Sequence, residues 1–174
     1  MMRAMIRRLA AALALIAAPA AAEVHTPSPP ATVVVAFDRE SIRPLIVEGL
    51  ANLETERPVE ANDPVRIASI SKLIMALAAL RLVDEGKVDL DRDVSDYLGW
   101  KVRSPFHPDA PVTLAHLLSH RAGLSDKAGY SIPLGESLQA KFADRAAWRD
   151  TGKPGEAAFE YANLGSPLVA TVLE

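Results

Sequence analysis

One apolar run, residues 70 to 80, most constrains what this chain can fold into. It reads ISKLIMALAAL, and Lys72 is the one ionisable side chain between Arg66 and Arg81. A helix that is apolar on nearly every side is expected to be buried rather than to lie on a surface. The sequence therefore predicts a buried helix that carries a single ammonium group and ends near Gly86.

The isolated lysine follows Ser69 by three positions, in a Ser-x-x-Lys arrangement. Residues three apart share a helix face, so the Lys72 amine can reach the Ser69 hydroxyl. Burial favours a neutral amine, which would let Lys72 accept the proton of a serine nucleophile. Backbone NH groups at the start of the helix would face a developing oxyanion. The structural alternative is a lysine whose stem extends along the helix to bring its ammonium to the surface.

A second polar pair, Tyr161 and Asn163, follows Pro154-Gly155 and precedes another apolar stretch. A phenol and an amide two residues apart, on a loop or at the start of a helix, can face the same cleft. There the phenol would relay a proton and the amide would orient a lysine or a substrate carbonyl. The alternative is that Tyr161 packs in a core while Asn163 caps the last helix.

The first 22 residues have the pattern of a secretory signal. Three arginines precede a short apolar run, Leu9 to Ala18, and Ala20-Ala21-Ala22 forms a small-residue cleavage site. The run is too short for a stable membrane span. We therefore expect export to the periplasm or secretion, with a mature chain that begins at Glu23.

Charge and cysteine content exclude several functions. Removal of the signal leaves 16 basic against 22 acidic side chains, a net charge of −6, which argues against a nucleic-acid partner. The absence of cysteine excludes disulfides, thiolate nucleophiles and cysteine-based metal sites.

The remaining pattern predicts a mixed α/β (α+β) chain, and its length favours one domain. A Pro-rich linker, residues 23–31, is followed by residues 32–174, which begin with two strands, Thr32 to Phe37 and Leu45 to Ala51, joined as an antiparallel hairpin. The rest is expected to be mainly helical. Besides the Ser69 helix, the expected helices are residues 114–120 capped by Thr113, residues 138–148, and residues 164–173.

Two patterns suggest metals but are better explained without them. His116 and His120 have an i, i+4 spacing, yet Leu117 stands where a zinc protease has its glutamate and no third ligand is evident. The acidic stretch of residues 84–93 lacks the glycine and the final glutamate of a calcium loop, so a solvated, helix-capping stretch is favoured. We expect no metal and no organic cofactor.

Four blocks, in this order and spacing, closely resemble the serine beta-lactamase-related family, which includes class C beta-lactamases, low-molecular-weight penicillin-binding proteins, D-amino-acid peptidases and related esterases. The blocks are Arg66-Ile67-Ala68-Ser69-Ile70-Ser71-Lys72, Leu82 to Asp91, Val112 to His120 with Gly123-Leu124, and Pro154-Gly155 with Tyr161-Ala162-Asn163-Leu164-Gly165. The resemblance implies a beta-lactamase/transpeptidase-like fold, in which the N-terminal strands join a central antiparallel sheet beside a mainly helical domain.

The resemblance also implies acyl-enzyme chemistry. Ser69 would attack a carbonyl, Lys72 and Tyr161 would handle its proton, and Asn163 would orient Lys72 and the substrate. The Ser69 backbone NH would supply half of the oxyanion hole. Which of Lys72 and Tyr161 acts as the base is left open.

The chain also departs from the family pattern. Ala162 replaces the usual serine, Arg121-Ala122-Gly123 replaces Thr-Ser-Gly, and a third motif, Lys-Thr-Gly or His-x-Gly, does not occur before Glu174. We therefore expect an N-terminal half of a longer hydrolase domain, incomplete at the C-terminus. A non-catalytic penicillin- or peptidoglycan-binding module and an inactive truncated product are the alternatives. The expected partner is a small-molecule or peptidoglycan-like substrate, with beta-lactam, D-Ala peptide and ester all open; the oligomeric state is not predicted.

Overall fold

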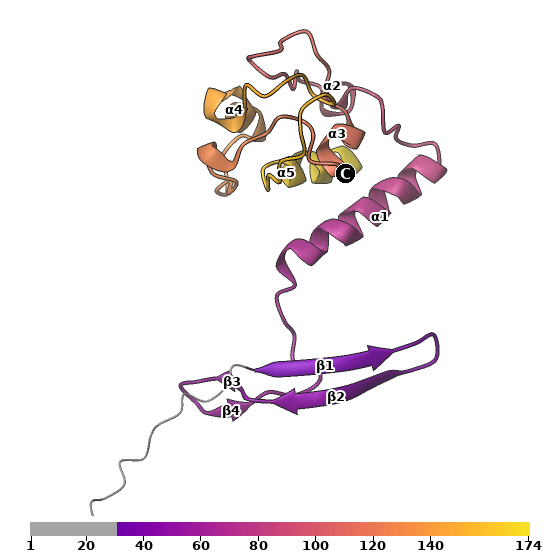
Figure 1. Ribbon diagram of the computed structural model, residues 1–174, viewed down its shortest axis with the longest axis vertical. Coiled ribbons are helices and arrows are strands. Elements are labelled where there is room, and N and C mark those ends of the chain that lie inside the picture. Colours follow the sequence, from indigo (N-terminus) through magenta and orange to yellow (C-terminus); the bar gives the residue numbers. More distant parts are fainter. Residues whose placement is uncertain (1–30) are drawn as a thin grey trace, which may run out of the picture. The chain divides into compact units, whose positions relative to one another are not determined.

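The computed structural model describes residues 31–174, and its internal contacts divide the chain into two compact units at the boundary between Val65 and Arg66. The expected export signal, residues 1–22, lies outside the described residues, as does most of the Pro-rich linker. The first unit contains short strands and the second is mainly helical. Both predicted kinds of structure are therefore present, in agreement with a mixed fold (Figure 1).

The strands of the first unit form antiparallel pairs. β1 (Thr32–Phe37) pairs with β2 (Ile42–Glu48), as the sequence predicted, and β3 (Leu50–Asn52) pairs with β4 (Arg57–Pro58). The Asp38 carboxylate organises the β1–β2 turn by accepting hydrogen bonds from the backbone NH groups of Glu40 and Ser41. An aspartate that replaces missing backbone partners in this way favours a tight turn.

The second strand differs from its predicted range because the sheet register shifts within the hairpin. Val34 pairs with Ile46 and Val35 pairs with Pro44, which leaves Leu45 as an extra residue in β2. Proline has no NH to donate to a sheet ladder and is tolerated at such bulges. The predicted single strand Leu45 to Ala51 is thus divided between the end of β2 and the start of β3.

The second unit combines five α-helices with three short 3-10 helices. In chain order these are η2 (Ala68–Ile70), α1 (Ser71–Asp84), α2 (Val94–Leu98), α3 (Leu114–Leu118), η3 (Asp126–Ala128), α4 (Leu138–Ala143), η4 (Arg145–Ala147) and α5 (Gly165–Leu173). The helix after Ser69 ends as predicted, with Gly86 in a left-handed conformation at φ 67°. The predicted helix 138–148 is interrupted at Asp144, which is extended and caps η4 through the Ala146 NH.

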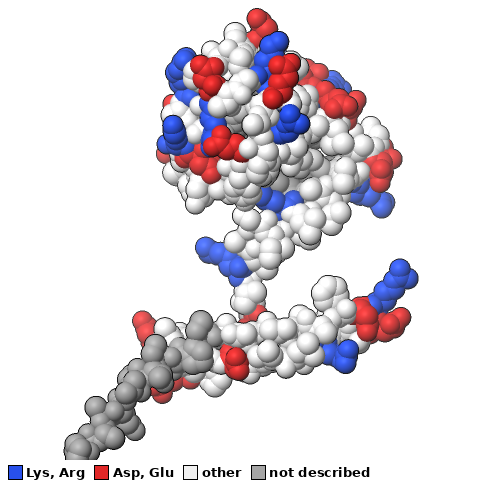
Figure 2. All heavy atoms as spheres, in the orientation of Figure 1, with Lys and Arg blue, Asp and Glu red and all other residues white. Residues whose placement is uncertain are grey.

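Helix α1 is less buried than its sequence predicted. Ala79 is its one buried residue, whereas Leu73 and Ile74 are each 59% exposed. Within residues 66–174 the helix contacts α5 on one face, and much of its remaining surface is exposed. In the view of Figure 2, uncharged surface predominates over this helix. Within residues 66–174, the expectation of burial on every side is therefore wrong, because apolar composition does not itself provide packing partners.

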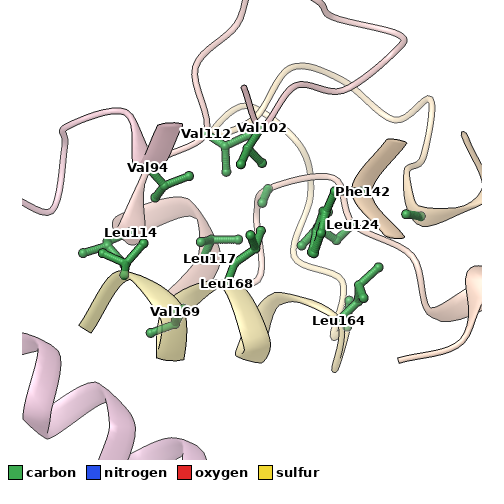
Figure 3. Close-up of a cluster of buried hydrophobic side chains, with 14 of the residues drawn as sticks. Val94, Val102, Val112, Leu114, Leu117, Leu124, Phe142, Leu164, Leu168 and Val169 are labelled. Carbon is green, nitrogen blue, oxygen red and sulfur yellow. The ribbon is translucent and has the colours of Figure 1, made fainter. Parts of the chain in front are cut away.

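The hydrophobic core of the second unit lies around α3 and α5. Leu114 and Leu117 from α3 face Leu168 and Val169 from α5, and Phe142 of α4 extends the same cluster (Figure 3). Leu114 and Leu168 are fully buried. This core holds α5, and with it the loop that precedes α5, against the rest of the unit.

Side-chain caps fix where the short helices begin. Thr113 accepts a hydrogen bond from the His116 NH, and the His116 ring accepts one in return from the Thr113 NH, so the predicted cap of α3 is confirmed. The helix ends at Leu118, earlier than predicted, because the chain turns into a left-handed conformation at His120, φ 54°. Asp93 caps α2 by accepting from the Ser95 NH.

No helix among residues 31–174 combines the length and apolar character needed to cross a bilayer.

Candidate active site

Ser69 and Lys72 lie at the junction of η2 and α1. The Lys72 Nζ donates a hydrogen bond of 3.1 Å to the Ser69 Oγ, as the three-residue spacing predicted. Ala68, directly before the serine, has φ 45°, a conformation that costs a non-glycine residue roughly 1–2 kcal/mol. Such local strain is typical of functional sites, where the surrounding structure holds it in place.

Tyr161 and Asn163 reach the same point from the loop before α5. The Tyr161 hydroxyl donates to the Ser69 Oγ at 2.7 Å, and the Lys72 Nζ donates to the Asn163 Oδ1 at 2.9 Å. The structure therefore brings all four predicted site residues into one hydrogen-bonded cluster, which lies wholly within residues 66–174. Tyr161 is not packed in the core, and Asn163 is not a side-chain cap of α5.

The hydrogen-bonded cluster lowers the pKa of the Tyr161 phenol. A hydrogen bond from Lys72, followed by the one with Ser69, lowers the pKa of Tyr161 below its ordinary value of 10.0. The Lys72 Nζ also lies 5.0 Å from the centre of the Tyr161 ring. A nearby ammonium favours the phenolate over the neutral phenol, so the cluster makes Tyr161 a better proton acceptor at moderate pH.

The His120 ring packs against the Tyr161 ring. The two ring centres lie 4.5 Å apart at 32°, and the His120 Nδ1 accepts a 3.3 Å hydrogen bond from the Ala162 NH. The His120 carbonyl accepts a further one from the Glu160 NH at 3.1 Å. Burial, followed by the charge of Lys72, lowers the pKa of His120. The histidine thus stays a neutral acceptor that holds the Tyr161 segment.

Asp126, the first residue of η3, lies on the other side of Asn163. Its carboxylate accepts from the Asn163 backbone NH at 3.0 Å, the Asn163 Nδ2 at 2.9 Å and the Leu164 NH at 3.0 Å. Burial by itself raises the pKa of Asp126, but the hydrogen bonds from Asn163 and Leu164 outweigh it and leave the pKa below the ordinary value. The aspartate is therefore a charged acceptor at neutral pH.

A small pocket opens beside Lys72. It has a volume of about 50 Å³ and is lined by apolar side chains that include Met75, Leu117 and Val169. Sites for small-molecule ligands are typically about 300–1,000 Å³. The pocket is too small for such a substrate, and Ser69, which does not line it, is exposed.

The two histidines weighed as zinc ligands do not share a helix face. His116 lies in α3, where its Nδ1 belongs to the cap, while His120 lies beyond the helix end. The glycine of the Pro154-Gly155 pair, at φ 88°, approaches the His116 ring so closely that a Cβ would lie 2.5 Å from Nε2. Among residues 31–174, no group of three or more His, Cys, Asp or Glu side chains is placed to hold a metal ion.

Sequence reasoning missed Asp126 and the role of His120. Asp126 lies three positions after Gly123, next to Ser125, which caps η3 through the Lys127 NH. The sequence signal that could have pointed to Asp126 was its place in a capped turn just after the block that ends with Gly123-Leu124. It did not show which distant segment the carboxylate would meet, because that depends on how the loop docks.

Comparison with known proteins finds one family for the part of the chain that contains these residues. The model of the family described as "Beta-lactamase" matches residues 15–174. Esterase EstB of Burkholderia gladioli is 41% identical over 78 residues, which cover 44% of this chain and 20% of the esterase. The D-alanyl-D-alanine-carboxypeptidase/endopeptidase AmpH of Escherichia coli is 31% identical over 118 residues, which cover 63% of this chain and 29% of AmpH.

A solved structure of a penicillin-binding protein homologue agrees with this family match. The octameric penicillin-binding protein homologue from Pyrococcus abyssi superimposes with a TM-score of 0.63 and 28% identity, over 81% of this chain and 34% of that protein. The chain thus spans between a fifth and about a third of the length of these three relatives. Because the family model covers most of the sequence and the fold agrees, the chain belongs to the beta-lactamase family.

Proposed function

We propose that this chain carries the nucleophile of a serine hydrolase that works through an acyl-enzyme on Ser69. The observation that carries the proposal is the position of the Ser69 Oγ, which lies 2.7 Å from the Tyr161 hydroxyl and 3.1 Å from the Lys72 Nζ. A serine is a weak nucleophile unless an adjacent group takes its proton. Two groups able to exchange a proton with Ser69 lie within hydrogen-bonding distance of its oxygen.

We assign the base to Tyr161. Lys72 as an ammonium has N–H donors and no acceptor, and it donates to both Ser69 and Asn163. The phenolate of Tyr161, favoured by the same ammonium, would take the Ser69 proton as the Oγ–carbonyl carbon bond forms. The phenol would then return the proton to the leaving group as the carbonyl carbon–leaving group bond breaks. Water would then attack the acyl carbonyl carbon as Tyr161 takes its proton, and the phenol would give that proton to the Ser69 Oγ as the Oγ–carbonyl carbon bond breaks, which releases the acid and restores the serine.

The oxyanion would be held in part by backbone. Ser69 lies in the first turn ahead of α1, where NH groups have no acceptor within the helix. We propose that the Ser69 NH is one donor to the oxyanion of the tetrahedral intermediate. The strained Ala68 before it would fix the direction of this NH relative to the attacking oxygen.

The proposed substrate is an ester, a D-Ala peptide or a beta-lactam. Relatives named as an esterase and as a D-alanyl-D-alanine-carboxypeptidase support the first two. Family membership supports the third. All three substrates have a carbonyl carbon bonded to an oxygen or nitrogen that can leave. The same attack by Ser69 could therefore acylate the serine with any of them.

Covalent labelling tests the nucleophile. The protein treated with a fluorescent penicillin or a fluorophosphonate should be labelled on Ser69, and Ser69→Ala should abolish the label. Ser71→Ala is the matched control, because Ser71 is an exposed serine at the start of α1 whose side chain forms no hydrogen bond to Tyr161 in the described structure. Undiminished labelling of Ser69→Ala would refute the assignment.

The pH dependence of labelling tests the base. The rate should rise with pH through a pKa below 10.0 and then level off, because the phenolate form of Tyr161 is the active one. Tyr161→Phe should remove this rise and slow labelling by about 100-fold or more. A rise of the same midpoint and size in Tyr161→Phe would assign the base to another group.

A further inference from the structure

We propose that Asp126 is a positioning residue that sets the orientation of the Asn163 amide and through it the position of Lys72. The proposal rests on the proposed hydrolase function of the Ser69 cluster. Asp126 makes no hydrogen bond to Ser69, Lys72 or Tyr161 in the described part of the chain, and its hydrogen bonds go to Asn163 and to the neighbouring Leu164 NH.

The Asn163 side chain lies between a cation and an anion. Its Oδ1 accepts from the Lys72 Nζ at 2.9 Å, while its Nδ2 donates to the Asp126 Oδ2 at 2.9 Å. The amide therefore carries the interaction from the Asp126 carboxylate to the Lys72 ammonium. Hydrogen bonds with one charged partner are roughly twice as strong as neutral ones, and this amide makes two of them.

The charge of Asp126 decides which way the amide faces. An amide can turn its oxygen or its nitrogen toward a neighbour, and only the partners determine which. An ionised carboxylate accepts and never donates, so it requires the Nδ2 on its own side and leaves the Oδ1 for Lys72. A neutral side chain at position 126 would also tolerate the reversed amide, which would bring two N–H donors, Nδ2 and Nζ, face to face.

The same carboxylate fixes the backbone beneath the amide. Its two oxygens accept from consecutive NH groups, those of Asn163 and Leu164, both at 3.0 Å. These two residues directly precede α5, and Leu164 is its N-cap position, where NH groups have no acceptor within the helix. Asp126 thus anchors both the side chain and the main chain of Asn163, which limits its rotation about the Cα–Cβ bond.

Several charged groups surround this link. Lys72 reaches it from α1 through the Asn163 amide, Arg149 acts on Asp126 at longer range, and His120 faces Tyr161 from the loop after α3. The Asp126 charge in turn raises the pKa of Tyr161 slightly against the larger lowering by Lys72 and Ser69. Loss of the Asp126 charge would by itself lower the pKa of Tyr161, whereas displacement of Lys72 would raise it, because the hydrogen bond from Lys72 is the largest cause of the lowered pKa.

A double-mutant cycle tests the proposal. Asp126→Asn should slow acylation of Ser69 by a fluorophosphonate about tenfold to 100-fold, as expected for a misplaced reacting group. In Asn163→Ala the link is already broken, so adding Asp126→Asn should slow the reaction by no more than about twofold. If instead the two losses multiply in the double variant, Asp126 does not act through Asn163 and the proposal is overturned.

A matched control separates positioning from general stability. Asp93 is also a partly buried carboxylate that caps a helix, and it forms an ion pair with Arg103, but it has no link to Asn163. Asp93→Asn should destabilise the protein yet change the acylation rate by less than about twofold. A loss of rate in Asp93→Asn as large as in Asp126→Asn would show that the effect is structural and would overturn the proposal.

A measurement without catalysis distinguishes this proposal from the proposed function. In ¹H–¹⁵N NMR spectra of the protein, Asp126→Asn should move the Asn163 side-chain amide signals and reduce hydrogen-exchange protection of the Asn163 and Leu164 amides by about tenfold or more. The Ala162 amide, which donates to His120, should keep its protection. If these changes occur in a protein that never labels on Ser69, the hydrolase assignment fails while the link stands; unchanged Asn163 signals would overturn the link.

Discussion

Replacement of Gly155 by alanine should destabilise the protein through two separate effects. Gly155 has φ 88°, a conformation that side chains rarely adopt. A Cβ placed there would also lie 2.5 Å from the Nε2 of His116, with Cδ2 at 3.1 Å and Cε1 at 3.2 Å. The new methyl group would meet the end of the imidazole ring, and either the ring or the loop must move.

The magnitude follows from adding these effects. The left-handed conformation costs a non-glycine residue roughly 1–2 kcal/mol. Overpacking of one methyl group against a held ring costs about 1–3 kcal/mol. The ring is held because His116 Nδ1 accepts from the Thr113 NH in the cap of α3. The free energy of unfolding should therefore fall by about 2–5 kcal/mol, with the larger values if α3 loses its cap.

Gly86→Ala supplies the control, because Gly86 has φ 67° and no atom lies within 4 Å of the position that a Cβ would take there. That variant should lose only the conformational part, roughly 1–2 kcal/mol. Urea unfolding followed by circular dichroism measures both. In addition, Gly155→Ala should cost less when His116 is also alanine than when it is histidine. Equal losses in Gly155→Ala and Gly86→Ala would refute the close-approach argument.

Three further predictions concern the core, the pH dependence of stability, and export. Leu168→Ala should lower the free energy of unfolding by about 2–5 kcal/mol, because Leu168 is fully buried. Denaturant unfolding measures this loss, and a loss below about 1 kcal/mol would contradict the role of Leu168 in the core. Burial lowers the pKa of both His116 and His120 from 6.5, so the unfolded chain takes up protons first and stability should fall as pH drops below 6.5 toward their folded pKa values. The glutamine variants of both should show a weaker decline in melts between about pH 7 and pH 5. N-terminal sequencing of exported protein should begin at Glu23, and an intact start in the cytoplasm would contradict the proposed signal.

Local chemistry made part of the site predictable from sequence. The Ser69–Lys72 contact follows from helix geometry, because residues three apart meet whatever the rest of the fold does. The β1 strand is equally local, since its run of valines favours extended structure. Tyr161 lies 92 positions from Ser69, so only the resemblance to a known family connected them before the structure did.

The features that sequence did not predict depend on tertiary partners. The exposed face of α1 could not be foreseen, because hydrophobic periodicity describes a helix and not what covers it. The break at Asp144 arises because its carboxylate competes for a backbone NH that a continuous helix would use. Asp126 belongs to the same class, since an aspartate in a loop gives no sign of the segment that it will contact 37 positions later.

The hydrogen bonds that tie residues 160–164 to the loop 120–126 have a consequence for folding. Four amides of one short segment, those of Glu160, Ala162, Asn163 and Leu164, donate into this loop. Ala162 and Leu164 of this segment are buried in the core cluster, whereas Tyr161 between them is 43% exposed. The segment is therefore tied to the core around α3 and α5 and should open only when that core opens. Mild denaturant would then leave the Ser69 cluster intact until the core itself unfolds, and the Tyr161 side of the cluster would form together with the core during refolding.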